Sequence, residues 1–345
     1  MQVELQEKIE SCLKPLIPPA TRRIAIIDPP DHPNIGDSAI LLGELDFLWK
    51  NFPETELVFV SHKFGNAAAA RAIDRCDMLL FHGGGNFGDI WPALHRFRLD
   101  VMRNHPEIPK IQLPQSVHFD DIELKDETAD VIGMQKSFTL LVRDAKSFEA
   151  ARSFNCSTIL CPDLAFYMEK RRLPIARKPA IDLLALVRTD KESASGLGKQ
   201  IERALTDSAR SYEVIDWLDE KDQFFLQAAH FVANQIRLRP KMSSVFGPIY
   251  QNLLTTHAAR RVTRGFRLLN RGRVGAADRL HAHILFTILG KPHLIADSYD
   301  GKISAFYETW TKKSGCATFM DDSNEVGAVI GQFVQQFSRT DAIAE

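Results

Sequence analysis

The sequence predicts an α/β protein with two doubly wound lobes, and three observations lead to this fold class. The chain has 345 residues, which is enough for two ordinary domains. From Arg23 onward, short apolar runs alternate with amphipathic stretches, as in βαβ units around a parallel sheet. A basic stretch with two prolines, Met168–Pro179, interrupts this alternation and indicates a linker. We therefore expect two Rossmann-like lobes, with ligands bound in a cleft between them at the carboxyl ends of strands.

The first predicted lobe covers residues 1–170 and is expected to carry the acceptor side of the site. Its expected strands are Ile24–Ile27, Leu57–Val60, Met78–Phe81, Lys110–Leu113, Thr139–Val142 and Thr158–Leu160. Its expected helices are Ser38–Lys50, Asn66–Arg75, Trp91–Asn104, Asp126–Met134 and Ala145–Ser153.

The second predicted lobe covers residues 178–322, and a helix with a tail is expected over 323–345. Its expected strands are Ile181–Val187, Tyr212–Ile215, Ser243–Phe246, Val274–Ala277 and His293–Ile295. The expected helices are Lys199–Arg210, Gln223–Arg237, Ile249–Asn270 and, at the end of the chain, Asn324–Phe337.

Composition excludes several classes of function. A formal net charge of −1 gives no overall electrostatic attraction to nucleic acid. The five cysteines are scattered and form no C-x-x-C pair, which argues against a disulfide framework or a zinc site, and no clustered ligand set suggests another metal. No apolar run approaches the roughly 18 residues of a membrane span. We expect a cytoplasmic protein without metal or cofactor.

The loop after the first strand leads into a helix through Asn34-Ile35-Gly36-Asp37. We expect Asp37 to be the N-cap of that helix, and Gly36 to allow a tight turn. Asn34 and Asp37 would then point toward the ligand, where Asp37 could also accept a proton. A purely structural role for Asp37, as a helix cap, is an equally good interpretation.

A glycine-rich segment, Gly83-Gly84-Gly85-Asn86, follows the third strand. With Gly88 it matches G-x-G-x-x-G, but its place in the lobe is wrong for a dinucleotide fingerprint. It also resembles a lipase oxyanion loop, yet the chain has no G-x-S-x-G elbow. What remains is a loop whose backbone N–H groups a ligand can approach closely, with Asn86 as a polar contact.

The motif Asp278-Arg279-Leu280-His281 lies where a strand of the second lobe passes into a helix. A helix N-terminus carries unpaired N–H groups and partial positive charge, and Arg279 adds a bidentate guanidinium, so the motif predicts an anion site. His281 in the first helical turn is a candidate acid or base, since histidine titrates near neutral pH.

Three further strand ends carry charged residues. Arg188 ends a strand of the second lobe and could contact the same anion. Lys302 lies on a glycine-containing loop, where it is either a second cation for the ligand or an ordinary solvated lysine. The pair Arg143-Asp144 is more typical of a structural contact between loops.

Together these motifs resemble the polysaccharide pyruvyl transferase family, and particularly the exopolysaccharide ketal-pyruvate transferases. Each motif is short, but their order and spacing are fairly specific. They are Asn34–Asp37, Gly83–Asn86, Arg143-Asp144, Arg188, Asp278–His281, Gly290-Lys291-Pro292 and Asp300-Gly301-Lys302. Two departures, Ala282 in place of glycine and the loop Leu113–Ser116, bear on the identity of the acceptor.

The resemblance implies a fold like that of the two-lobed GT-B glycosyltransferases and a reaction with phosphoenolpyruvate as donor. A pyruvyl group would form a cyclic ketal with two hydroxyls of a sugar in a lipid-linked exopolysaccharide precursor, and phosphate would be released. Arg188, Arg279 and Lys302 would hold the donor's phosphate and carboxylate, His281 would transfer protons, and Asn34, Gly84, Gly85 and Asn86 would contact substrate.

A basic stripe adds a further expectation. Arg260, Arg264, Arg267 and Arg271 recur along one predicted helix at spacings that place them on one face. This face is either simply solvated or contacts anionic lipid at the inner face of the cytoplasmic membrane or the diphosphate of a lipid-linked oligosaccharide. Two rival functions stay open: a GT-B glycosyltransferase that uses a nucleotide sugar, and a non-catalytic glycan- or anion-binding protein.

Overall fold

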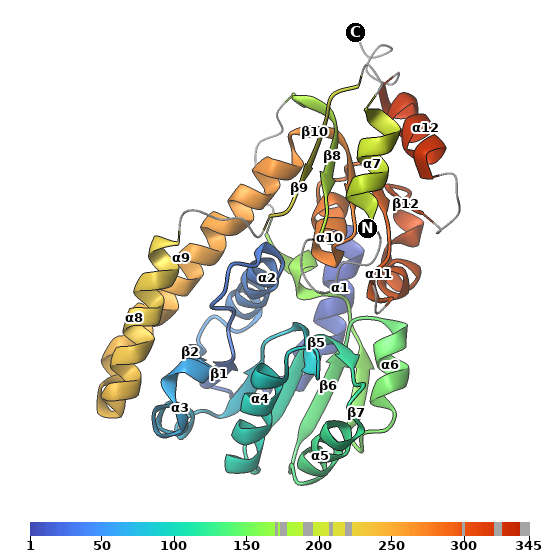
Figure 1. Ribbon diagram of the computed structural model, residues 1–345. Coiled ribbons are helices and arrows are strands. Elements are labelled where there is room, and N and C mark those ends of the chain that lie inside the picture. The colour runs from blue at the N-terminus through green and yellow to red at the C-terminus, as the bar shows by residue number, and fades with distance from the viewer. Residues whose placement is uncertain are drawn as a thin grey trace. The chain divides into compact units, whose positions relative to one another are not determined.

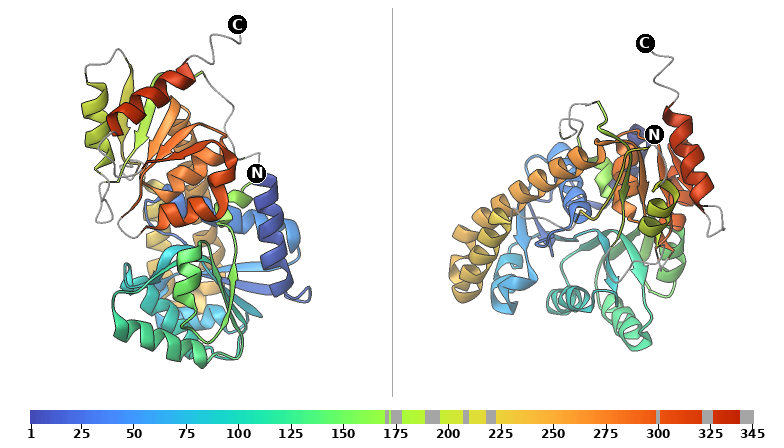
Figure 2. Two further views of the ribbon diagram at one scale, coloured as in Figure 1. Left: turned by 90° about the vertical axis from the view of Figure 1, so that its right-hand side faces the viewer. Right: turned by 45° about the horizontal axis from the view of Figure 1, so that its top comes forward.

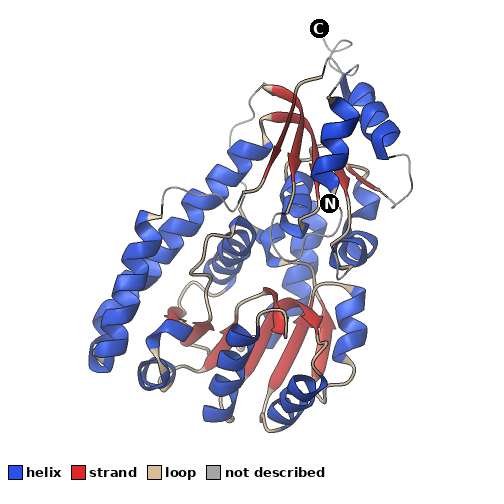
Figure 3. Cartoon of the chain, in the orientation of Figure 1, coloured by secondary structure: helices blue, strands red, loops and turns tan. Residues whose placement is uncertain are grey.

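The computed structural model describes residues 1–169, 172, 178–188, 196–206, 210–217, 223–298, 301–320 and 326–338. It separates into two compact units, the first of residues 1–169 and 220–260 and the second of residues 170–219 and 261–345. Each unit is a parallel sheet flanked by helices (Figures 1 and 3). This is the predicted α/β class with two doubly wound lobes.

The first unit is built on a seven-stranded sheet in the order β2-β1-β3-β5-β6-β7, with β4 paired to β5. Its strands are β1 Arg23–Ile27, β2 Glu56–Val60, β3 Met78–Phe81, β4 Gly84–Gly88, β5 Lys110–His118, β6 Phe138–Val142 and β7 Ser157–Leu160. Its first helices are α1 Gln2–Leu13, α2 Ile35–Asn51, α3 Asn66–Ile73, α4 Pro92–Asn104, α5 Ile122–Gly133 and α6 Ala145–Ala151. Short 3₁₀ turns are η1 Lys14–Leu16, η2 His62–Phe64 and η3 Leu164–Tyr167.

The second unit contains a five-stranded sheet in the order β12-β11-β10-β8-β9, parallel throughout. The strands are β8 Ile181–Leu186, β9 Tyr212–Ile215, β10 Gly272–Ala277, β11 His293–Ile295 and β12 Ala317–Phe319. The helical elements are α7 Leu197–Leu205, α10 Leu280–Ile288, α11 Lys302–Phe306, the π-helical turn η6 Tyr307–Thr311, η7 Lys312–Ser314 and α12 Val326–Ser338.

The boundaries of the units differ from the predicted ones over residues 220–260. This segment contains α8 Phe224–Leu238, η5 Pro240–Met242 and the first part of α9 Ser243–Leu269, and it belongs to the first unit. The reason is burial: α8 packs against η2 and α3 and hides an apolar row there (Figure 2). That row is Leu226, Ala229, Ala233 and Ile236.

Residues 323–345 were expected to form a separate helix and tail, but the described helix α12 packs on the second sheet. Ile330, Phe333 and Val334 join the core that β8, β10 and α7 also supply. Apolar burial therefore makes α12 part of the second unit. Residues 323–325 and 339–345 of this segment lie outside the described residues.

One predicted strand is wrong. Ser243–Phe246 is helical, because α9 begins at Ser243 and continues through Pro248. A proline in the second turn of a long helix removes one main-chain hydrogen bond without ending the helix. The short run Ser243–Phe246 had been expected to form a strand.

Candidate functional site

Asn34, and not Asp37, caps helix α2, which corrects the sequence prediction. The Asn34 Oδ1 accepts a 2.9 Å hydrogen bond from the Gly36 N–H, and the helix begins at Ile35. Asp37 therefore lies in the first helical turn, where it is buried, and its carboxylate is 3.6 Å from the His32 Nε2. A carboxylate in the first turn is stabilised by the helix dipole.

Asp37 and the glycine segment lie together. A Cβ atom added to Gly84 would come within 3.3 Å of the Asp37 Oδ1, and Gly84 has a φ of +121°. Only glycine adopts this conformation at low cost, and it leaves the carboxylate room. The sequence predicted a loop for Gly84-Gly85-Asn86, and this is wrong. The segment is part of strand β4, which pairs with β5.

The glycine segment is held by side chains of β5 and α2. The Asn86 N–H donates to the Gln115 Oε1 at 3.1 Å, and the Gly83 N–H donates to the Glu44 Oε1 at 2.9 Å. Gly85 faces the Arg143 guanidinium, because a Cβ atom at Gly85 would lie 3.5 Å from it. Backbone and guanidinium are thus brought together at the carboxyl edge of the first sheet.

Arg143 itself is buried and is part of a polar network. Its Nε donates to the Ser116 Oγ at 3.0 Å, and its terminal nitrogen donates to the Asp163 carboxylate at 2.8 Å. Ser116 in turn donates to Asp144 at 3.0 Å. These contacts join the ends of β5, β6 and β7.

Sequence reasoning missed a buried pair, His82 and Glu44. The His82 Nδ1 lies 2.9 Å from the Glu44 Oε2, and both side chains are almost completely buried. Burial by itself lowers the pKa of His82, but the Glu44 carboxylate, and Asp37 more weakly, raise it above the usual value. The available signal was a glutamate in the apolar helix α2, on the same face as Asp37 and seven residues after it.

A second buried cluster at the same edge surrounds Asp28, which follows β1 with a φ of +62°. The Asp28 carboxylate accepts from Arg98 at 3.1 Å and lies 3.3 Å from the His62 Nδ1. The hydrogen bond to Asp28 raises the pKa of His62. A non-glycine residue in the left-handed region is strained, and these contacts hold it there.

In the second unit, the predicted residues gather at the carboxyl ends of β8, β9 and β10. The Arg188 N–H donates to the Asp278 Oδ1 at 2.7 Å, so Asp278 ties the end of β8 to the end of β10. Arg279 is the N-cap residue of α10, and it donates to the Asp216 carboxylate at 2.7 Å. Asp216, which follows β9, is the orienting residue that the sequence did not reveal.

His281 and Lys302 lie at the starts of two helices of the second unit. His281 is the second residue of α10 and is half-buried, next to the buried pair Asp278 and Arg279. Lys302 is the first residue of α11 and is also half-buried, after Gly301 with a φ of +68°. Asp300 lies outside the described residues.

His283 has a structural environment that differs from that of His281. Its two ring nitrogens lie 2.7 Å from the His293 Nε2 and 2.7 Å from the Thr311 Oγ1, and the ring is fully buried. Burial lowers the pKa of His283 well below the usual value, and it lowers that of His293 to about 4. Both rings are therefore neutral at pH 7.

Two properties of the described residues bear on the class of site. No group of three or more His, Cys, Asp or Glu side chains among them is arranged to hold a metal ion. None of the described helices is long and apolar enough to cross a membrane.

Comparisons with known proteins agree with this reading of the motifs. The model of the polysaccharide pyruvyl transferase family matches residues 34–298. Pyruvyl transferase 1 of Schizosaccharomyces pombe is 30% identical over 311 residues, which cover 84% of this chain and 70% of that protein. A candidate pyruvyl transferase of Bacillus subtilis, EpsO, is 26% identical over 323 residues, which cover 89% of this chain and 91% of that protein.

A solved structure shares the fold. The crystal structure of an uncharacterized protein from Klebsiella pneumoniae matches with a TM-score of 0.57, covering 92% of this chain and 98% of that one at 18% identity. The match supports the two-lobed, GT-B-like α/β architecture. The relatives do not favour the rival interpretation as a nucleotide-sugar glycosyltransferase. The family match, which spans most of the chain from Asn34 onward, shows that the protein belongs to the polysaccharide pyruvyl transferase family.

Proposed function

We propose that the protein transfers a pyruvyl group from phosphoenolpyruvate to two hydroxyls of one sugar in a lipid-linked exopolysaccharide precursor, and that it works in the cytoplasm without metal or cofactor. Family membership supports pyruvyl transfer to polysaccharide. The observation that supports this donor is Arg279, which is fixed by Asp216 at the start of α10, with Arg188 at the end of the neighbouring strand β8. A guanidinium held by a carboxylate keeps its fork oriented for a second anion.

The donor carries two anionic groups, and the second unit supplies cations for both. Arg279 and Arg188 would bind the carboxylate and phosphate, together with the N–H groups at the start of α10. Lys302, at the start of α11, is the third cation in this proposal. Asp278 would act indirectly, because it accepts the Arg188 N–H and so fixes the main chain at the end of β8.

The proposed reaction balances without an external reagent. A proton is added to C3 of phosphoenolpyruvate while the first sugar oxygen bonds to C2. The bond between C2 and the phosphate oxygen then breaks, and the second sugar oxygen bonds to C2. The sugar loses two hydroxyl protons in all. One compensates for the proton added to C3, which becomes a methyl carbon, and the other leaves with phosphate.

His281 and Asp37 have separate roles in this proposal. We assign proton delivery to His281, because it is a half-buried histidine in the first turn of α10, next to Arg279. Asp37 would accept a proton from a sugar hydroxyl in the first unit, where Gly84 leaves space beside its carboxylate. Asn34, Gly85 and Asn86 would contact the sugar near this carboxylate.

The first test is ligand specificity. Phosphoenolpyruvate at about 100 times its Kd should stabilise the protein by roughly 2.7 kcal/mol, whereas a UDP-sugar should have no effect. Phosphate release that requires an oligosaccharide acceptor would then establish turnover. Stabilisation by the UDP-sugar alone would contradict the proposal.

The second test separates the two roles in the second unit. His281→Ala should lower kcat by about 10²- to 10⁴-fold while the KM for phosphoenolpyruvate changes little. His118→Ala, at a partly exposed histidine of the first unit that lies 3.1 Å from Asp120, serves as a control. Full turnover by the His281 variant would remove it from the mechanism.

A further inference from the structure

The α8–α9 hairpin, defined as α8, η5 and the α9 residues up to 260, has an unusual outer surface. Three side chains of α8 are largely exposed: Phe224 at 68%, Phe231 at 65% and Leu238 at 62%. They are seven residues apart, so they lie on one side of the helix, opposite the row that packs on the first unit. The exposed apolar surface continues on η5 and α9 through Met242, Val245 and Ile249.

The same hairpin has no negative charge. The sequence from Gln223 to Ala277 contains no aspartate or glutamate. Around the turn between the helices lie three cations, Arg237, Arg239 and Lys241, all exposed. Exposed apolar side chains beside a purely cationic surface are typical of segments that lie against anionic lipid.

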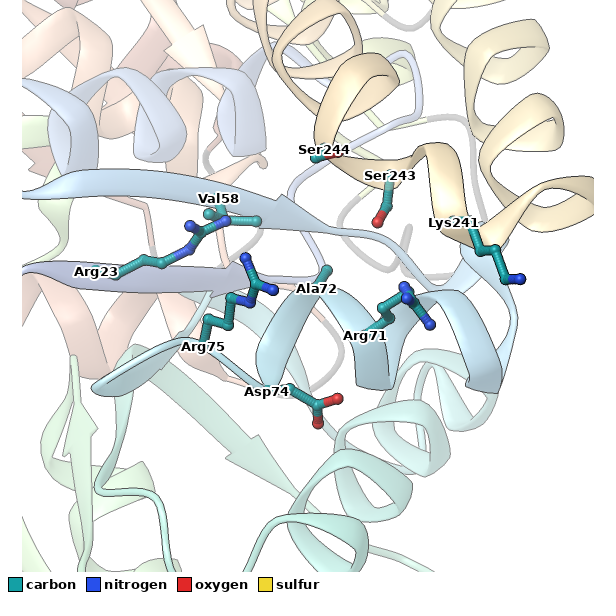
Figure 4. Close-up of a pocket in the computed structure, with 9 residues that line it drawn as sticks. All are labelled: Arg23, Val58, Arg71, Ala72, Asp74, Arg75, Lys241, Ser243 and Ser244. Atoms are coloured by element: carbon teal, nitrogen blue, oxygen red, sulfur yellow. The ribbon is translucent and has the colours of Figure 1, made fainter.

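A basic pocket opens beside this turn, within the first unit (Figure 4). It has a volume of about 370 Å³. Its lining residues are Arg23, Val58, Arg71, Ala72, Asp74, Arg75, Lys241, Ser243 and Ser244. In Figure 4, Arg23 comes from β1, Arg71 and Arg75 from α3 and the turn after it, and Lys241 from η5, just before α9.

The pocket keeps a positive charge after its ion pairs are counted. Arg23 is paired with Glu56 at 3.1 Å, and Asp74 adds one exposed carboxylate to the lining. Within the described residues, no ion pair engages Arg71, Arg75 or Lys241. The pocket therefore has the charge to bind a phosphate group and ample room for it, with the two serine hydroxyls as further donors.

This pocket is separate from the residues that we assign to catalysis. Arg23 is the first residue of β1 and pairs in register with Glu56, the first residue of β2. The pocket thus lies at the amino ends of these strands, whereas Asp37 and the glycine segment lie at the carboxyl ends. Pyruvyl transfer gives this second basic site no role.

We propose that the α8–α9 hairpin docks on an anionic phospholipid surface, with a lipid phosphate in the pocket formed by Arg71, Arg75 and Lys241 and with the exposed apolar row in the headgroup region. The docking extends the proposed function and rests on it for its purpose, because it would bring the enzyme to a lipid-linked acceptor. The site also differs from the predicted basic stripe, since Arg264 of that stripe donates to the Trp217 carbonyl and Arg271 pairs with Glu213.

Lipid explains the surface better than two other occupants. A soluble phosphate would fill the pocket but leave the apolar row exposed. A second copy of the chain in a two-fold dimer would bring the same acid-free, cationic hairpin against itself, where like charges repel. A lipid surface satisfies both features, since phosphates lie directly above acyl chains.

The test is co-sedimentation with vesicles of phosphatidylcholine with or without phosphatidylglycerol, in the absence of phosphoenolpyruvate and acceptor. The full chain should bind only the anionic vesicles, and less at high salt. Arg71→Glu with Lys241→Glu should weaken binding at least about 30-fold, from roughly 1 kcal/mol per lost cation. Lys136→Glu with Arg152→Glu makes the same charge change elsewhere on the first unit, at exposed positions, and should retain binding.

A second pair of variants tests the apolar row. Phe231→Ser with Leu238→Ser should weaken vesicle binding by roughly 10-fold or more, because two side chains no longer enter the headgroup region. Ile122→Ser with Met134→Ser removes two equally exposed apolar side chains on and just after α5 and should have no effect. All four variants should turn over a water-soluble oligosaccharide acceptor normally.

Several outcomes would overturn the docking. The first two are no binding to anionic vesicles and an equal loss of vesicle binding in the test and control variants. The other two are a protein that free inorganic phosphate stabilises but that binds no vesicles, and a dimer that dissociates in the hairpin variants. None of these depends on turnover. If instead vesicle binding behaves as expected but phosphoenolpyruvate is not consumed, the proposed function fails and the docking stands.

Discussion

The carboxyl edges of the two sheets hold their charges in different ways. In the first unit, Asp28, Glu44 and Asp163 are buried, and each is paired with a buried cation or histidine of the same unit. In the second unit, the largely buried carboxylates of Asp278 and Asp216 position Arg188 and Arg279, which we propose bind the donor. The first network fixes loops at the ends of its strands, whereas in our proposal the second prepares cations for the anionic donor. The difference can be tested, because equivalent changes should damage folding in one unit and binding in the other.

The largest expected effect is on the stability of the first unit. Arg98→Ala leaves Asp28 buried without its guanidinium, which should cost about 3–5 kcal/mol of unfolding free energy. Hydrogen exchange should show the loss in peptides of the first unit. Arg96→Ala, two residues away in α4 and 59% exposed, is the matched control and should change stability little. An effect confined to catalysis would contradict a structural network at this edge.

In the second unit, the same kind of change should act on donor binding. Arg279→Ala removes the guanidinium that Asp216 orients, and kcat/KM for phosphoenolpyruvate should fall by roughly 100- to 1000-fold, as expected when one member of a buried charge pair is truncated. Arg279→Lys should recover only part of this, because an ammonium has no fork. Arg267→Ala, at an exposed arginine of the same unit, controls for charge. A loss of folding without any change in donor KM would show that both edges are structural.

The residues at the edge of the second sheet also show what the sequence could predict. Strand ends and helix starts follow from local patterns, so Arg188, Arg279 and His281 were found at the edge where they lie. Asp216 and Glu44 were missed, because each meets its partner across a long sequence separation: Arg279 is 63 residues from Asp216, and His82 is 38 from Glu44. Periodicity carries no information on such pairs.

The errors in the fold have local physical reasons. The glycine segment was predicted to be a loop, and glycine is indeed rare in strands, yet β4 pairs with β5, whose Gln115 side chain also accepts from the Asn86 N–H. Ser243–Phe246 was predicted as a strand, but α9 begins there and continues through Pro248, and its buried Tyr250 packs against Phe64 of the first unit, which outweighs one missing hydrogen bond. Both cases concern elements whose stability comes from neighbours that are remote in sequence.

Acid should weaken the second unit through His293. Its pKa is lowered to about 4 by burial, so the unfolded chain takes up a proton near pH 6.5 and the folded one does not. The stabilisation is therefore fully present above pH 6.5 and is lost as the pH falls toward 4, by roughly 3 kcal/mol. His293→Gln should reduce this dependence in hydrogen-exchange measurements on peptides of the second unit, and His283, whose pKa burial also lowers, should keep a part with the same sign.

His82 provides the opposite sign in the first unit. Because its pKa is raised in the folded state, its contribution is present below the usual histidine pKa and declines as the pH rises through the folded value. Glu44→Gln should remove that decline. The first unit also contains His95, whose pKa burial lowers to about 3, so its contribution to stability has the opposite sign. The pH profile of Glu44→Gln must therefore be compared with that of the wild type. An unchanged profile in Glu44→Gln would show that the pair does not exchange a proton with solvent.

The smallest expected effect decides whether Asn34 belongs to the first unit's structural network or to its acceptor site. Asn34→Ala removes the bond to the Gly36 N–H and should cost about 1 kcal/mol of stability. Asn34→Ser keeps an N-cap oxygen and should recover most of that stability. The two variants differ in capping, but both lack the amide that would bind a sugar hydroxyl. If only capping matters, the acceptor KM is normal in the serine variant; if Asn34 binds the sugar, the KM rises in both, whatever their melting temperatures.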